Sequence, residues 1–570
     1  MPPETSRRTF VKGIAAAGIF GGLGLWRAPV WAITSPGEEN VLARTDFDLF
    51  IGETPVNITG NPRTAMTING GIPGPLLRWR EGDTVTLRVR NKLNADTSIH
   101  WHGILLPANM DGVPGLSFHG IEPGGMYVYQ FKVRQNGTYW YHSHSGLQEQ
   151  SGVYGPLVID AKEPEPFQYD RDYVVMLTDW TDEDAVDLMK TLKKQSDYYN
   201  YNKRTVGDFI HDVSEKGWGS TIADRKMWAE MKMNPTDLAD VSGATYTYLM
   251  NGQSPDMNWT GVFRPGEKLR LRFINGSAMT YFDVRIPGLK MTVVAADGMH
   301  IKPVSVDEFR IAVAETFDVI VEPTQDAYTL FAQSMDRTGY ACGTLAIKTG
   351  VSAPIPPLDP RPLVNMDDMG MGGMDHGAMG GDMAGMDHSG MAGMGEMQSH
   401  PASESNNPLV DMQAMTTSPK LDDPGLGLRN NGRRVLTYSD LRSTFTDPDG
   451  RDPSRTIELH LTGHMEKFAW SFNGVKFSDA EPLRLKYGER IRIVLVNDTM
   501  MTHPIHLHGM WSDLEDENGQ FMVRKHTIDM PPGSRRSYRV TADALGRWAY
   551  HCHLLYHMEM GMFREVRVEE

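Results

Sequence analysis

The chain has 570 residues, with 72 acidic and 56 basic side chains and a formal net charge of −16. A chain of this length should contain several domains. Its acidic balance argues against nucleic-acid binding and favours cationic partners. The 57 glycines and 35 prolines, with many short alternating apolar runs, favour an all-β protein built from sandwich domains.

The first 32 residues predict an export signal. Arg7 and Arg8 precede an apolar run rich in glycine and alanine, and small residues lead up to Ala32. This is the outline of a twin-arginine signal peptide, which predicts a periplasmic protein. The apolar run is too short and too glycine-rich for a stable spanning helix, so we expect no stable membrane anchor. An uncleaved anchor is the alternative.

An internal repeat predicts three similar β domains. Glycine followed by an acid, at Gly82, Gly266 and Gly488, precedes a strand that leads to an asparagine at position 91, 275 or 497. The predicted strands are Val85–Arg90, Tyr127–Val133, Leu269–Phe273, Phe317–Val321 and Ile491–Val496. The repeat places the domains at residues 41–160, 172–350 and 434–570.

Two segments lie outside this repeat. Residues 182–241, within the second domain, are charged and predict a partly helical insertion of unknown role. Residues 351–433 form a linker before the third domain, and ten methionines occur between residues 366 and 397. Glycine content and lack of periodicity predict disorder in this methionine-rich linker.

The methionine-rich linker also predicts labile copper binding, because soft thioethers prefer Cu(I). Two Met-Asp-His units supply candidate ligands, namely Met374, His376, Met386 and His388. The alternative is a flexible linker whose methionines are incidental or serve as oxidation sinks.

Ten of the 19 histidines fall into four clusters: His100 and His102; His142 and His144; His503, His506 and His508; His551, His553 and His557. Cys552 stands between His551 and His553, and Met562 follows. On a strand, the two histidines share one face while Cys552 points to the other, so one strand can serve two metal sites. Thiolate, imidazole and a weak thioether are the ligands of a blue copper centre.

Several remaining residues are expected to be structural. Cys342, the only other cysteine, should be buried alone, because a disulfide would remove the thiolate that copper requires. Histidines outside the four clusters should be structural or exposed: His119, His211, His300, His460, His464 and His526.

The four motifs, in this order and spacing, resemble those of the multicopper oxidases. The resemblance implies three cupredoxin-like Greek-key domains and four copper ions per chain. His503, Cys552 and His557 would bind the type 1 copper with Met562 axial, and His100 and His506 the type 2 copper. The two type 3 coppers would be held by His102, His142 and His553, and by His144, His508 and His551. The trinuclear cluster would then lie between the first and third domains, with the second as a spacer.

The same resemblance implies roles for residues near these ligands. Asp111 matches an acid that assists proton delivery, although an aspartate before glycine is also an ordinary turn residue. Some relatives carry a second acid after the histidine that corresponds to His557, where this chain has Met558. Asp498, Met500 and Met501 resemble the substrate-ion site of cuprous oxidases, and core packing is the alternative for the methionines.

The sequence therefore predicts a periplasmic oxidase that couples one-electron oxidation of Cu(I) to reduction of dioxygen to water, in copper resistance. A laccase-like oxidase of phenols or catechols is one alternative, and a non-catalytic copper-sequestering protein is another. Periplasmic copper carriers are candidate partners.

Overall fold

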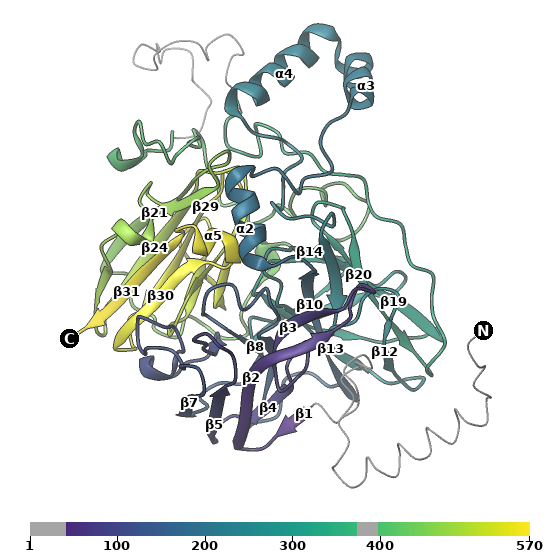
Figure 1. The fold of residues 1–570 in the computed structure, drawn as a ribbon, viewed down its shortest axis with the longest axis vertical. Helices are drawn as coiled ribbons and strands as arrows, with labels where there is room; N and C mark the ends of the chain where they lie inside the picture. The colour runs from purple at the N-terminus through teal and green to yellow at the C-terminus, as the bar shows by residue number, and fades with distance from the viewer. Residues whose placement is uncertain (1–40, 373–396) are drawn as a thin grey trace.

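The computed structural model describes residues 41–372 and 397–570. The predicted signal peptide and the candidates Met374, His376, Met386 and His388 lie outside these residues. Within the two described ranges, none of the helices combines the length and the apolar character that crossing a membrane requires. Figure 1 shows three β domains around a common centre, with the helices α3 (Val206–Lys216) and α4 (Trp218–Met231) projecting above them.

The first domain consists of a five-stranded sheet, β1-β4-β9-β8-β6, and a four-stranded sheet, β3-β2-β5-β7. Buried and exposed residues alternate along β2 and β5, as expected for strands with one face on a core. The strands are β1 Val41–Ala43, β2 Asp46–Val56, β3 Arg63–Ile68, β4 Leu76–Arg80, β5 Thr84–Asn91, β6 His100–His102, β7 Met126–Lys132, β8 Gly137–His142 and β9 Tyr154–Asp160.

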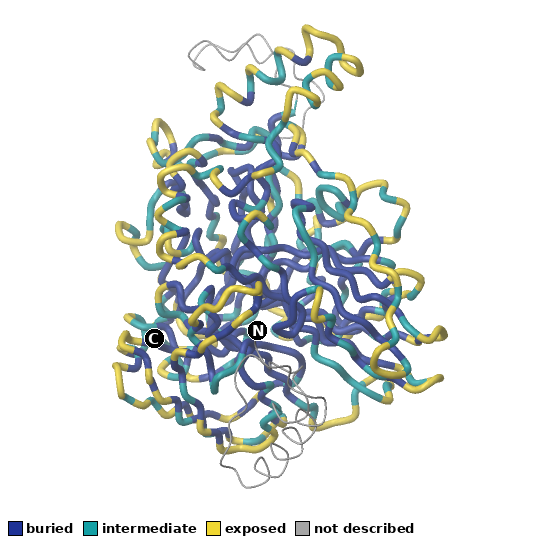
Figure 2. Tube along the Cα trace, turned by 45° about the vertical axis from the view of Figure 1, so that its right-hand side comes forward, coloured by how far each residue is buried: buried dark blue, intermediate teal, exposed yellow. Residues whose placement is uncertain are grey.

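The second domain has a six-stranded sheet, β11-β10-β13-β18-β15-β16, and a five-stranded sheet, β12-β20-β19-β14-β17. Its central strands β13 and β18 are buried along nearly their whole length, and Figure 2 shows buried segments through the middle of the molecule with exposed ones mainly at its periphery. They are β10 Arg171–Thr181, β11 Tyr246–Met250, β12 Trp259–Val262, β13 Leu269–Asn275, β14 Phe282–Arg285, β15 Met291–Ala296, β16 Met299–Val306, β17 Glu308–Ile311, β18 Thr316–Val321, β19 Ala327–Ser334 and β20 Tyr340–Ala346.

The third domain repeats this arrangement, with sheets β22-β21-β24-β29-β26-β27 and β23-β31-β30-β25-β28. The short helix α5 (Leu555–Glu559) lies between its last two strands. The strands are β21 Arg455–His464, β22 Ala469–Phe472, β23 Leu483–Lys486, β24 Arg490–Asn497, β25 His503–Leu507, β26 Ser512–Glu515, β27 Phe521–Lys525, β28 Thr527–Met530, β29 Arg535–Thr541, β30 Gly546–Cys552 and β31 Phe563–Glu569.

The predicted repeat has a structural basis in the asparagine that ends β5, β13 and β24. In each domain its side-chain amide donates to two backbone carbonyls, and its side-chain oxygen accepts from the backbone amide two residues later. Each of these three strands also pairs in parallel with the first long strand of its domain, β2, β10 or β21. The glycine before each strand has a positive φ, at +93° for Gly82, which explains the repeated residue.

The insertion contains three helices, as predicted: α2 (Ala185–Lys194), α3 (Val206–Lys216) and α4 (Trp218–Met231). Asp184 caps α2 by accepting hydrogen bonds from the first turn, and Thr205 and Asp208 form a capping box on α3. Helices α3 and α4 project from the β domains (Figure 1).

The described flanks of the methionine-rich linker pack against the β domains. Met369 and Met412 are among its buried side chains. The expectation of a disordered linker over residues 351–433 is therefore too broad, because residues 351–372 and 397–433 are held by tertiary contacts.

Candidate metal centres

Strand register brings the four histidine clusters together. His100 on β6 lies opposite His142 on β8, and His506 on β25 lies opposite His551 on β30. These strand pairs belong to the first and third domains, and Asp111 links them by accepting a hydrogen bond from Nδ1 of His508 at 2.8 Å. The expectation of a site between these two domains agrees with this arrangement.

Eight histidines form one group at this junction, and all of them are buried except His144, which is half-buried. Nε2 of His551 lies 3.3 Å from Nε2 of His144 and 3.1 Å from Nε2 of His508. Nε2 of His553 lies 3.3 Å from Nε2 of His142. The rings of His100 and His506 lie 5.8 Å apart, and His102 stacks on His506 at 3.8 Å.

The positions of these nitrogens are better explained by bound metal ions than by hydrogen bonds between the histidines. Nε2 of His100, Nδ1 of His102 and Nε2 of His506 are buried and have no hydrogen-bond partner among the described residues. Buried polar atoms are normally paired, so three orphaned nitrogens in one cluster indicate absent ligands. Several sets of three ligands lie close enough for one ion, including His144, His508 and His551. The sets overlap, so distances alone do not sort the eight histidines into three ions.

Several of the outward-facing nitrogens are held by neighbouring groups, which orients the inward ones. Nδ1 of His100 donates to the backbone oxygen of Asp111 at 2.8 Å. Nδ1 of His142 contacts a carboxylate oxygen of Glu149 at 2.6 Å, and Nδ1 of His506 donates to the backbone oxygen of His526 at 2.6 Å.

Burial favours the neutral form of several imidazoles in the group. It lowers the pKa of His102, His142 and His508 well below the usual range, and that of His551 to about 3. Neutral imidazole is the form that binds metal.

A second ligand set surrounds the cysteine. Nδ1 of His503 lies 3.5 Å from Sγ of Cys552, Nδ1 of His557 lies 4.0 Å from it, and the two nitrogens are 3.2 Å apart. Met562 is fully buried, and its backbone bonds to both Cys552 and His557. Burial raises the pKa of the Cys552 thiol, so a cation is needed to stabilise the thiolate. Cys342 is a separate buried free cysteine, as expected.

Asp240 is a functional residue that the sequence analysis missed. Its carboxylate accepts a hydrogen bond from Nε2 of His557 at 2.7 Å, and both side chains are fully buried. Asp240 belongs to the insertion, so the second domain is more than a spacer. No local motif marks this aspartate, because its partner lies 317 residues away.

Two histidines outside the four sequence clusters contact residues of the candidate sites. His526 contacts Nε2 of His102 through its Nδ1 at 3.2 Å, and His460 contacts Asp498 at 2.6 Å. Both are buried, which agrees with a structural role, and only the tertiary structure brings them to partners that are distant in the sequence.

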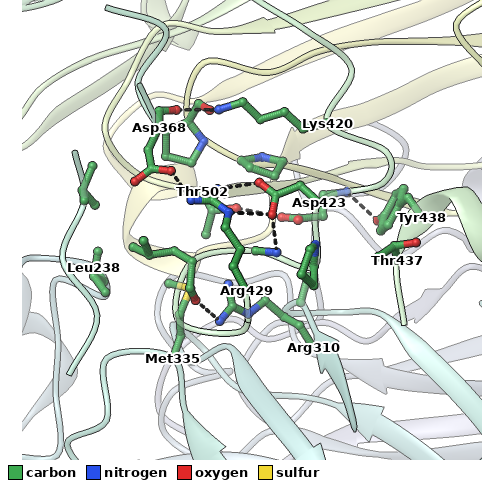
Figure 3. Close-up of a pocket in the computed structure, with 18 of the residues that line it drawn as sticks. Leu238, Arg310, Met335, Asp368, Lys420, Asp423, Arg429, Thr437, Tyr438 and Thr502 are labelled. Atoms are coloured by element: carbon green, nitrogen blue, oxygen red, sulfur yellow. Dashed lines mark hydrogen bonds and ion pairs between the residues drawn. The ribbon is translucent and has the colours of Figure 1, made fainter. Parts of the chain in front are cut away.

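The candidate substrate residues before His503 are all buried. Asp498 is enclosed by His400 and His460, and Met501 lies in the hydrophobic core. Met500 and Thr502 line a cavity of about 80 Å³ between the second domain, the linker and the third domain (Figure 3). Arg429 beside this cavity is paired with Asp368 and Asp423.

Comparisons with known proteins agree with this geometry. Three multicopper oxidase family models match residues 51–164, 171–349 and 450–570. The chain is 79% identical to the "Copper resistance protein A homolog" of Pseudomonas syringae pv. tomato and 72% identical to the "Copper resistance protein A" of Escherichia coli, over 100% of both chains in each case. It is 30% identical to the "Multicopper oxidase MmcO" of Mycobacterium tuberculosis, over 89% of this chain and 84% of that one.

Solved structures show the same fold. The multicopper oxidase Fet3p, which functions in iron import, superimposes with a TM-score of 0.64 at 19% identity, covering 93% of this chain and 91% of that one. The laccase from Botrytis aclada gives 0.60 at 20% identity, covering 93% and 88%. The chain belongs to the multicopper oxidase family of oxidoreductases that use dioxygen, with three cupredoxin-like domains, and within that family its likeness to the copper resistance proteins extends over its whole length.

Proposed function

We propose that the protein oxidises Cu(I) to Cu(II) and reduces dioxygen to water. The proposal rests on the end of β30. There the side chain of Cys552 faces the cysteine site, while those of His551 and His553 face the eight-histidine group. His503, Cys552, His557 and Met562 would hold the type 1 copper, and His100 and His506 the type 2 copper. His102, His142 and His553 would hold one type 3 copper, and His144, His508 and His551 the other.

Copper at these positions would supply one-electron transfer at the cysteine site and multi-electron chemistry at the histidine cluster. In balance, four Cu(I) ions give up one electron each, and one O2 takes up four electrons and four protons to yield two waters. Cys552 is covalently adjacent to His551 and His553, which provides a short bonded route between the two sites.

Asp111 is proposed to assist with protons. One carboxylate oxygen accepts from Nδ1 of His508, and the other lies 3.3 Å from Nδ1 of His100. It therefore contacts two members of the cluster while being almost fully buried. Met558 offers no second acid, so Asp111 carries this role without help from that position.

Cu(I) as substrate is supported by a cavity of about 650 Å³ between the insertion and the third domain. Met233, Asp237 and Met465 are among its lining residues. Thioethers favour Cu(I), and Asp237 lies three residues from Asp240, the partner of His557. A cation in this cavity would lie on the insertion side of the cysteine site.

Periplasmic location and twin-arginine export are proposed from residues 1–32, and labile Cu(I) binding from the methionine-rich residues 366–397. Cu(I) oxidation in that compartment would serve copper resistance, because Cu(I) crosses membranes and attacks thiolates more readily than Cu(II).

Oxygen uptake on adding Cu(I) to purified, copper-loaded protein tests the proposal. We expect uptake with one O2 consumed for every four Cu(I) oxidised. The double variant Met233→Leu/Met465→Leu should raise KM for Cu(I) and leave oxidation of a phenol unchanged, while Met257→Leu, an exposed methionine elsewhere, should change neither. Turnover of phenols without turnover of Cu(I) would favour the laccase-like alternative.

Deletion of residues 366–397 separates the two parts of the proposal. We expect lower Cu(I) turnover at limiting copper and unchanged turnover at saturation, because the segment would only concentrate the substrate. Copper tolerance that survives Cys552→Ser but not this deletion would favour the sequestering protein over the oxidase.

A further inference from the structure

A second group of histidines and carboxylates lies outside the eight-histidine cluster and the cysteine site. His400 and Glu404 come from the linker flank that follows the methionine-rich residues, and the short 3-10 helix Ala402–Glu404 carries the glutamate. His460 lies on β21, and Asp498 directly follows β24. Both carboxylates and His460 are buried, and the His400 side chain is 17% exposed.

The four side chains converge on one point. Oδ2 of Asp498 lies 3.2 Å from Nδ1 of His400 and 2.6 Å from Nδ1 of His460. The Glu404 carboxylate lies 3.4 Å from Nδ1 of His400 and 3.7 Å from Nδ1 of His460. Neighbouring ligands about 2.0–2.2 Å from one ion lie roughly 2.8–3.6 Å from one another, with square-planar arrangements at the short end and tetrahedral ones at the long end. The four observed spacings, from 2.6 to 3.7 Å, span this range and extend slightly beyond both ends.

The outward atoms of the group are already engaged. Nε2 of His400 donates to the backbone oxygen of Ala414 at 3.0 Å, and Nε2 of His460 contacts Glu458 at 3.2 Å. The other oxygen of Asp498 accepts from the backbone amide of Ala414 at 2.8 Å. Metal-binding histidines usually have their second nitrogen held in this way by a carbonyl or a carboxylate.

One inward atom is not satisfied by the group itself. Oε1 of Glu404 is buried and has no hydrogen-bond partner among the described residues, although the glutamate is almost fully enclosed. A buried carboxylate oxygen without a donor is costly, and a bound cation would satisfy it.

We propose that His400, His460, Glu404 and Asp498 bind one divalent copper ion. Two imidazole nitrogens and two carboxylates are the ligands that Cu(II) accepts readily, whereas Cu(I) prefers sulfur. The identity of the ion as the oxidation product rests on the proposed function, but the binding site does not.

The position of the site suits a product ion. Asp498 lies five residues before His503, and His400 follows the methionine-rich residues by three positions. Along the chain, a thioether-rich segment suited to Cu(I) is thus followed by a nitrogen and oxygen site suited to Cu(II). The assignment also changes the role predicted for Asp498, which here binds the oxidised ion together with histidines from other parts of the chain.

Metal content after equilibrium dialysis of the copper-loaded full chain against Cu(II) tests the proposal. We expect His400→Asn and Glu404→Gln each to retain one Cu(II) fewer than the unmodified protein. The exposed His211→Asn should retain the same number, and all variants should keep the blue absorption that reports an intact cysteine site. Equal copper content in all four proteins would overturn the proposal.

Anomalous scattering at the copper edge, from crystals soaked in Cu(II), provides a test independent of variant stability. A peak bounded by the four side chains is expected, and a map with peaks only at the other copper sites would refute the assignment. Oxygen uptake on Cu(I) measured in parallel separates the two proposals. Normal oxygen uptake in protein that does not bind the extra Cu(II) would contradict only the proposed Cu(II) site. Binding of the extra Cu(II) without oxygen uptake would contradict only the proposed oxidase function.

Discussion

Asp240→Asn tests how the second domain influences the cysteine site. The substitution keeps the shape of the side chain and removes the negative charge that accepts a hydrogen bond from His557 at 2.7 Å. Both groups are fully buried, so water does not replace the lost interaction. A carboxylate stabilises Cu(II) more than Cu(I) because the oxidised ion carries more charge, and its removal should therefore raise the reduction potential.

The size of this change follows from the effect of such partners on metal affinity. Loss of a group that holds a metal-binding histidine typically costs about 10–100-fold in affinity. If this loss falls mainly on Cu(II), a tenfold change corresponds to about 59 mV for one electron, so the potential should rise by about 60–120 mV.

Redox titration followed by the blue absorption measures the potential directly. Asp336→Asn is the matched control, because Asp336 is also a buried aspartate of the second domain and none of its described interactions involves His557 or Asp240. An Asp240→Asn protein that keeps its blue colour with an unchanged or lower potential would refute the reasoning.

Further predictions concern pH, the cluster and the fold. Burial raises the pKa of Asp240 to about 7, so ionisation above that pH should lower the reduction potential of the unmodified protein, and redox titrations of Asp240→Asn should show a weaker pH dependence. Glu149→Gln should reduce copper retention by the histidine cluster by about 10–100-fold on chelator titration, because Glu149 holds His142 at 2.6 Å. Gly112→Ala should destabilise the protein by more than about 2 kcal/mol in denaturant unfolding, because φ is +84° and an added Cβ would lie 1.8 Å from the backbone oxygen of Ile99. A small loss of stability would mean that this loop can move.

Much of the fold could be predicted because each domain repeats the same local pattern. The glycine turn, the alternating strand and the terminal asparagine are readable in sequence, and the structure shows why they recur: the asparagine makes the same hydrogen bonds in all three domains. The spacing of His551, Cys552 and His553 likewise determines which side chains share a face, because alternation along a strand is a local property.

Partners that are distant in sequence could not be predicted in this way. Asp240 meets His557 from an insertion with no recognisable motif, and His400 meets His460 and Asp498 from a linker whose composition suggested disorder. Strand periodicity is a property of neighbouring residues, so the sequence determined the repeated domains and which histidines share a strand face with or against Cys552. Which buried carboxylates and histidines contact the metal-binding residues was decided by how the three domains and the linker pack. Only close packing excludes water and brings such distant segments into contact.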